Sequence, residues 1–202
     1  MSNSVDSPHS FEQRVTAVIA VLAGVLLGLG WLIDINERFG TMLGTSLTTI
    51  AGVLLGPTVV LFYWVAFRDR TPRLGLIAVL MAAVGTIVMV GAINIPVVAR
   101  AAGEGVQELM EGTTYTILGI TAFILLLVGF ILTAVGIYRS RRLSNWIALV
   151  VGLAPVVVAV GGPIGIHQVT ASGFILLGAG VAAAGTQLWP KSPVDDPNTR
   201  SE

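Results

Sequence analysis

The chain has 202 residues, of which 54% are hydrophobic and only 11% are charged, and its formal net charge is zero. Soluble domains carry about 25% charged residues, and a soluble domain of this size lacks the interior to bury so many apolar side chains. The composition therefore favours a membrane protein. It gives no basic field to attract nucleic acid, and the absence of cysteine excludes disulfides and thiolate sites.

Uncharged stretches along the chain predict the membrane spans. The first, Val15–Ile33, lies between Arg14 and Asp34 and meets the length of about 20 residues that one crossing needs. The tail before it carries Asp6 and Glu12 rather than a basic run, so we expect a retained helix and not a signal peptide. The next three uncharged stretches, residues 39–67, 74–99 and 112–138, each allow one crossing with some tilt.

The last uncharged stretch, Leu143–Pro190, is too long for one crossing. Glycine and proline near its middle, at positions 161–165, predict a tight turn that divides it in two. The sequence thus predicts one transmembrane domain, residues 14–189, with spans at 15–33, 43–67, 74–98, 114–138, 143–160 and 164–189. The polar tails, residues 1–13 and 190–202, are expected to be disordered and cytoplasmic.

Arginines are distributed unevenly between the two sides of this bundle. The loops 68–73 and 139–142 hold three arginines each, whereas the opposite side carries five acids against Arg38 and Arg100. Because short cytoplasmic loops are enriched in Lys and Arg, we expect the arginine side and both termini to lie in the cytoplasm. The tryptophans lie near predicted span ends, where they are expected to act as interfacial anchors: Trp31, Trp64, Trp146 and Trp189.

Small residues recur at the spacing that brings helices close together in lipid. The segment AGVLLG occurs twice, at residues 23–28 and 51–56, and the last span is rich in glycine and alanine. Such faces mediate helix association. They serve either contacts inside the bundle or an interface with a membrane partner or second copy, through Gly24, Gly28, Gly52, Gly56, Gly178 and Ala182.

The predicted spans contain no charged residue, although charges inside a membrane normally mark function. This argues against proton relays, voltage sensing and carboxylate-based cation coupling. No lysine lies in a span to form a Schiff base, two histidines cannot form a haem pair between helices, and no phosphate-binding loop motif is present. We therefore assign no catalytic residue, metal or cofactor, and an enzyme is not favoured.

The connection 101–111 between the third and fourth spans has an amphipathic pattern. Glu104, Glu108 and Glu111 share one helical face, and apolar residues lie on another. This predicts a short helix on the outer surface. A solvated acidic face is favoured over a divalent cation site, which usually needs more converging oxygens.

Polar residues near the outer ends of the spans form the one candidate site. They are Asp34, Asn94, His167 and Gln168. We consider two interpretations: these groups converge on a shallow pocket for a neutral solute or a lipid headgroup, or each is separately hydrated at the interface.

The sequence thus predicts an all-α integral membrane protein, a six-helix bundle with both termini inside, expected in a prokaryotic plasma membrane. Its most favoured role is that of a non-enzymatic subunit or modulator that acts through helix packing. The alternative is a carrier or pore for a neutral or lipidic solute, which Pro57, Pro96, Pro155 and the outer polar groups favour.

Overall fold

The computed structural model describes residues 8–36, 41–101, 112–162 and 164–189. Within these ranges the chain is helical, without a strand. Its elements are α1 (Pro8–Ile33), α2 (Met42–Phe62), a π-helical continuation η1 (Tyr63–Phe67), α3 (Pro72–Ala101), α5 (Thr113–Ser140), α6 (Asn145–Gly161) and α7 (His167–Leu188).

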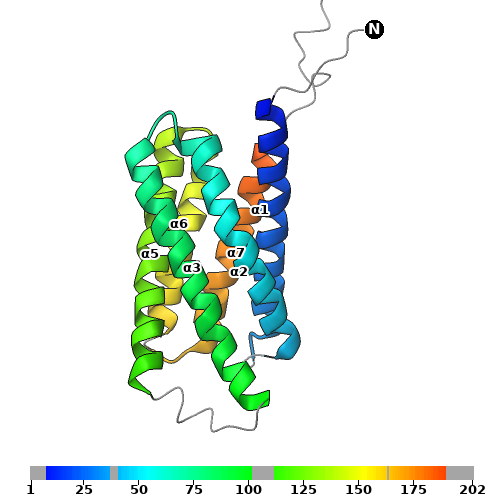
Figure 1. Cartoon of the computed structure of the whole chain (residues 1–202), viewed down its shortest axis with the longest axis vertical. Helices are drawn as coiled ribbons and strands as arrows, with labels where there is room; N and C mark the ends of the chain where they lie inside the picture. The colour runs from blue at the N-terminus through cyan, green and yellow to red at the C-terminus, as the bar shows by residue number, and fades with distance from the viewer. Residues whose placement is uncertain (1–7, 37–40, 102–111, 163, 190–202) are drawn as a thin grey trace, which may run out of the picture.

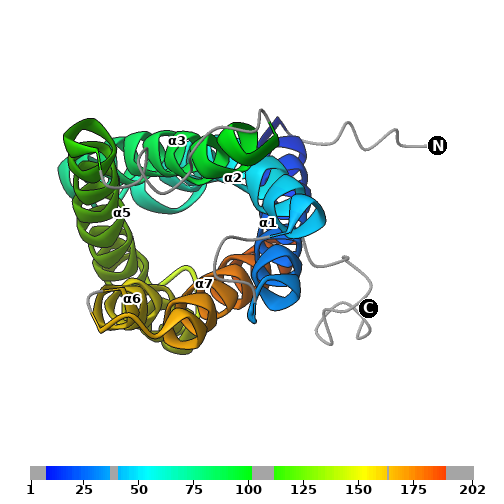
Figure 2. The same cartoon turned by 90° about the horizontal axis from the view of Figure 1, so that it is seen from below.

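The helices form a closed ring. Each one packs against its neighbours in the sequence, and α7 packs against α1 to complete the circle. Figure 1 shows the helices running up and down along a common long axis, and Figure 2 shows the ring from one end. The α2–α3 and α5–α6 connections, which carry the arginines, lie at one end of the bundle (Figure 1). We call this the arginine end, and the end with the α1–α2 and α6–α7 connections the opposite end.

Five helical segments are long and apolar enough to cross a membrane, namely Phe11–Ile33, Met42–Phe67, Pro72–Ala92, Thr113–Ser140 and His167–Leu188. Many large aliphatic side chains on these segments are exposed, such as Leu22, Leu80 and Ile120. Exposed apolar surface of this extent suits lipid rather than water. The prediction of an all-helical, multi-pass membrane protein is supported. The sixth helix, α6, is shorter at 17 residues, so six crossings remain a prediction.

The first helix is longer than the sequence predicted. It begins at Pro8 and includes residues 8–13, which the sequence analysis placed in the disordered tail. Proline is tolerated in a first helical turn because its missing N–H has no partner there. The Thr16 hydroxyl donates to the Glu12 carbonyl over 2.7 Å. A helix can leave the apolar layer and continue through polar residues, so hydropathy marks the span and not the helix end.

The last helix is shorter than predicted and starts at His167 rather than at position 164. Gly165 has a φ of +70°, a backbone conformation that glycine adopts without a Cβ penalty, and Ile166 is extended. The predicted amphipathic helix falls almost entirely on residues 102–111, outside the described residues.

Small residues bring the ring helices into close contact. A Cβ on Gly24 of α1 would collide with the carbonyl oxygen of Gly178 and lie 2.5 Å from the backbone nitrogen of Ala182, both on α7. A Cβ on Gly52 would collide with Val90 of α3. These positions serve contacts within the chain, as the first interpretation of the small-residue pattern expects. Gly28 and Gly56 have open space where a Cβ would lie.

Candidate functional site

A polar pocket lies at the opposite end of the bundle, where the end of α1 meets the turn between α6 and α7. Its volume is about 530 Å³, and it is lined by Asn36, Gly161, Gly162, Gly165, His167, Gln168 and Thr170. We call it the outer pocket. The described lining residues offer amide, imidazole and hydroxyl groups and include no carboxylate, lysine or arginine, so these residues provide hydrogen bonds without a formal counter-charge.

Two of the four predicted site residues, His167 and Gln168, line the outer pocket at the first turn of α7. The close contact between α6 and α7 positions them, because a Cβ on Gly161 would lie 2.5 Å from the Thr170 backbone nitrogen. Glycine at position 161 therefore lets α7 start directly beside the end of α6.

Asp34, the third predicted residue, contacts the site through its backbone. Its carbonyl oxygen lies 2.9 Å from the His167 Nε2 atom. Its carboxylate is buried and accepts hydrogen bonds from the Thr41 backbone N–H, at 2.8 Å, and from the Thr41 hydroxyl, at 2.7 Å. The Thr41 hydroxyl in turn accepts from the Gly44 N–H and caps α2. Asp34 thus joins α1, α2 and α7 structurally.

Asn94, the fourth predicted residue, does not line the pocket. Its amide nitrogen donates to the Thr49 hydroxyl over 2.8 Å and to the Val90 carbonyl over 2.8 Å, so it links α3 to α2. Side chains at similar depth need not share a site, because they can face different neighbours around the ring.

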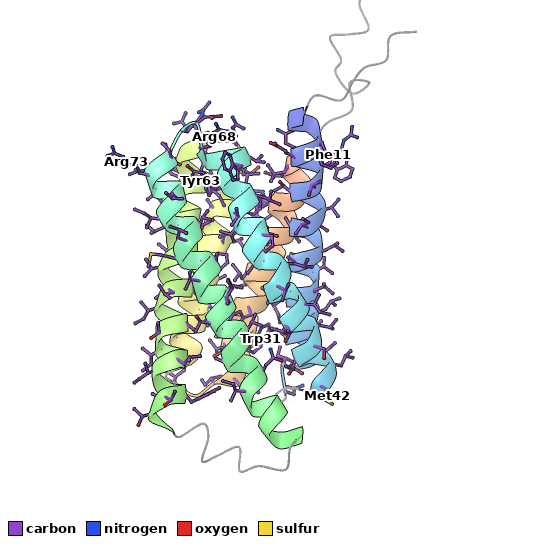
Figure 3. All side chains as sticks on the ribbon, viewed as in Figure 1. Phe11, Trp31, Met42, Tyr63, Arg68 and Arg73 are labelled. Carbon is purple, nitrogen blue, oxygen red and sulfur yellow. The ribbon has the colours of Figure 1, made fainter. Side chains whose placement is uncertain are left out.

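Trp31, which the sequence predicts to be an interfacial anchor, is partly buried and packs against the other helices. Figure 3 shows it between the helices near the opposite end. Its ring stacks on Phe174 with centroids 4.4 Å apart and lies 5.9 Å from the His167 ring. The other three tryptophans are about half exposed, as anchors would be. A residue at the depth of the interface points inward or outward according to its position around the helix.

A small cavity of about 30 Å³ lies deeper in the ring, bordered by residues of five helices that include Trp31, Phe174, Thr48, Thr86 and Leu126. The two threonine hydroxyls donate to backbone carbonyls of their own helices. The Trp31 indole N–H is buried and has no acceptor among the described residues. Trp31 borders this cavity, and its ring lies 5.9 Å from the ring of His167, which lines the outer pocket.

Sequence reasoning missed part of the lining. Asn36 is not among the four predicted site residues although it follows Asp34 closely, and Thr170 was given no role although it faces Gly161 across the helix contact. The glycine turn was the available signal, because it predicts where α6 and α7 come together. Ser172, which the sequence analysis did not assign as a nucleophile, is exposed and donates to the Gln168 carbonyl over 2.7 Å.

Comparison with protein-family models, with curated proteins and with solved structures finds no match to this chain.

Proposed function

We propose that this protein is a non-enzymatic membrane carrier or pore for a small uncharged solute, which enters through the outer pocket. The observation that carries the proposal is the outer pocket itself. Its described lining offers amide, imidazole and hydroxyl groups. Trp31, which borders the small cavity deeper in the ring, lies against His167 of this lining.

Two further features support a neutral solute. The lining residues that the structure describes include no carboxylate, lysine or arginine to pair with an ion, and stripping an ion of water without a partner is costly. The buried Trp31 N–H has no acceptor among the described residues. An unsatisfied buried donor costs about 1–3 kcal/mol, so an oxygen-bearing solute that reaches it gains a hydrogen bond.

We also propose that all six helices cross the membrane, with the arginine end and both termini in the cytoplasm of a prokaryote. The six arginines in the two loops favour this orientation. The outer pocket then faces the exterior.

The test is solute permeation through reconstituted protein. Proteoliposomes are exposed to a gradient of glycerol or urea, and reswelling is followed by light scattering against protein-free liposomes. We expect faster reswelling with the protein. Gln168→Leu and Thr170→Val should each slow it about fivefold, since each removes a hydrogen bond of about 1 kcal/mol.

Ser172→Ala is the matched control, because it removes a hydroxyl from the same helix outside the pocket lining. It should reswell as the wild type does. If the protein accelerates neither solute, and neither raises its thermal unfolding temperature in detergent, the proposal is wrong.

A second candidate is the subunit or modulator that the sequence first favoured. Gly91 on α3 is exposed, and a Cβ there meets nothing within 4 Å, so a helix of another protein has room to approach. Purification in mild detergent followed by mass spectrometry tests this. A stoichiometric partner that is lost in Gly91→Leu supports the candidate, and a partner-free monomer contradicts it.

A further inference from the structure

The turn between α5 and α6 at the arginine end presents three arginines in different environments. The Arg142 guanidinium donates to the Val65 carbonyl oxygen over 2.5 Å and contacts the Asp69 carboxylate at 3.1 Å. This ties the α5–α6 turn to η1. Arg139 and Arg141 are exposed and have no carboxylate partner among the described residues. The turn therefore carries positive charge that nothing in the described part of the chain offsets.

Arg141 lines a pocket at this turn, and Arg139 is not among the described lining residues of that pocket. The pocket has a volume of about 500 Å³, and its other lining residues are Tyr138, Leu143, Ser144 and Asn145. We call it the Arg141 pocket. Its described residues combine a guanidinium with phenol, hydroxyl and amide groups and include no acidic side chain. Guanidinium forks match the geometry of phosphate oxygens.

The backbone of the turn fixes this arrangement. Arg141 has a φ of 54° and ends α5, and it is the one described non-glycine residue with a positive φ. Gln187 of α7 holds Ser144 by two hydrogen bonds, of 2.9 Å to its N–H and 2.8 Å to its hydroxyl oxygen. The lining residues thus lie on a turn that hydrogen bonds connect to η1 and to α7. The start of α6 adds a partial positive charge.

Aromatic residues place the Arg141 pocket at headgroup depth. Tyr138 and Trp146 flank the turn and are 62% and 51% exposed, and such rings prefer the boundary between acyl chains and headgroups. A basic pocket at this depth beside membrane helices is suited to a lipid headgroup. We propose that the Arg141 pocket binds the phosphate group of an anionic lipid, a role independent of solute transport.

The experiment measures thermal unfolding of the purified full-length protein in a neutral maltoside detergent. Phosphatidylglycerol, phosphatidylcholine and inorganic phosphate are titrated in separate arms. We expect phosphatidylglycerol to raise the unfolding temperature more than phosphatidylcholine does. Arg141→Asn should raise the half-saturating phosphatidylglycerol concentration about tenfold, because it removes a hydrogen bond between the guanidinium and the phosphate, and such bonds between charged groups contribute about 1.5 kcal/mol. Asparagine tolerates the left-handed backbone, so the turn is kept.

Arg139→Gln is the control, since it removes the same charge from the same turn outside the pocket, and it should leave the titration unchanged. An equal loss in Arg139→Gln would show diffuse attraction and overturn the proposal. So would an equal response to phosphatidylcholine. If inorganic phosphate alone raises the unfolding temperature as much as phosphatidylglycerol does, the pocket binds a soluble anion, and the proposal that it binds a lipid is wrong. If Arg141→Asn is unstable without lipid, Arg141→Lys in the same titration decides, with weakened lipid binding again expected.

Discussion

At the scale of single residues, the two glycines of each AGVLLG segment have different roles. Gly24 lies against the backbone of α7, which cannot yield as a flexible side chain does. We predict that Gly24→Ala lowers the free energy of unfolding by about 1–3 kcal/mol, the usual cost of overpacking. The measurement is unfolding of the purified protein by a denaturing detergent, followed by circular dichroism.

Gly28→Ala is the matched control on the same helix, because a Cβ there meets nothing within 4 Å. We expect it to be neutral or to stabilise the protein by up to about 1 kcal/mol, since alanine favours a helix over glycine. Equal losses in the two variants would show that α1 and α7 do not meet at Gly24.

The candidate site shows how far residue patterns predict function. His167 and Gln168 were predicted and line one pocket, because the glycine turn before them fixes where α7 begins. Asn94 was predicted but pairs with Thr49, and Trp31 was expected at the lipid interface but stacks on Phe174. Hydropathy gives the depth of a side chain along the helix axis. It does not give the direction around the axis, which depends on helix packing.

At the scale of elements, the π-helical segment η1 packs against α3 and α5 at the arginine end. Phe67 within it is fully buried, and glycines on α3 and α5 make room for its ring: a Cβ would lie 2.5 Å from the Phe67 Cβ at Gly75, and 3.0 Å from its Cε1 at Gly136. The sequence predicted one continuous span over residues 43–67. The change of helix type within it had no local signal, because the buried Phe67 and the contact from Arg142 come from tertiary structure.

This packing predicts different effects on stability for two aromatic residues that lie within one helical turn, Phe67 and Trp64. Phe67→Ala should lower the free energy of unfolding by about 3–5 kcal/mol through the cavity it leaves. Trp64→Ala is the control in the same segment. Trp64 is 52% exposed, and its ring lies under the Arg68 guanidinium at 4.8 Å, so its loss should cost about 1 kcal/mol. Similar losses for both variants, measured by detergent unfolding, would contradict the buried position of Phe67.

At the scale of the whole molecule, the sequence predicted a helix bundle but not its closed ring. Short connections make consecutive helices neighbours, so most contacts followed from chain order. The contact between α1 and α7 joins the first and last helices, so chain order did not predict it. Small residues on both helices were the one indication, and they did not distinguish a contact within the chain from one with a partner.

The position of α6 decides the topology of the ring. At 17 residues it is about 25 Å long, less than the hydrocarbon thickness of about 30 Å. The uncharged stretch continues beyond both ends of α6, since no charged residue lies between Leu143 and Pro190. Because α6 packs against α5 and α7 along the bundle (Figure 2), we predict that it crosses the membrane, with Asn145 and Ile164 on opposite sides.

The absence of cysteine makes this directly measurable, because each single-cysteine variant carries one reactive thiol. Asn145→Cys and Ile164→Cys are at exposed positions, and Met42→Cys gives an exposed reference at the opposite end. In intact cells a membrane-impermeant maleimide should label positions 42 and 164, and position 145 only after permeabilisation. Labelling of 145 and 164 under the same condition would mean that α6 does not cross. The chain would then have five spans, the tails would lie on opposite sides, and the outer pocket would not form in the membrane-embedded protein, because it needs the ends of α1 and α6 together.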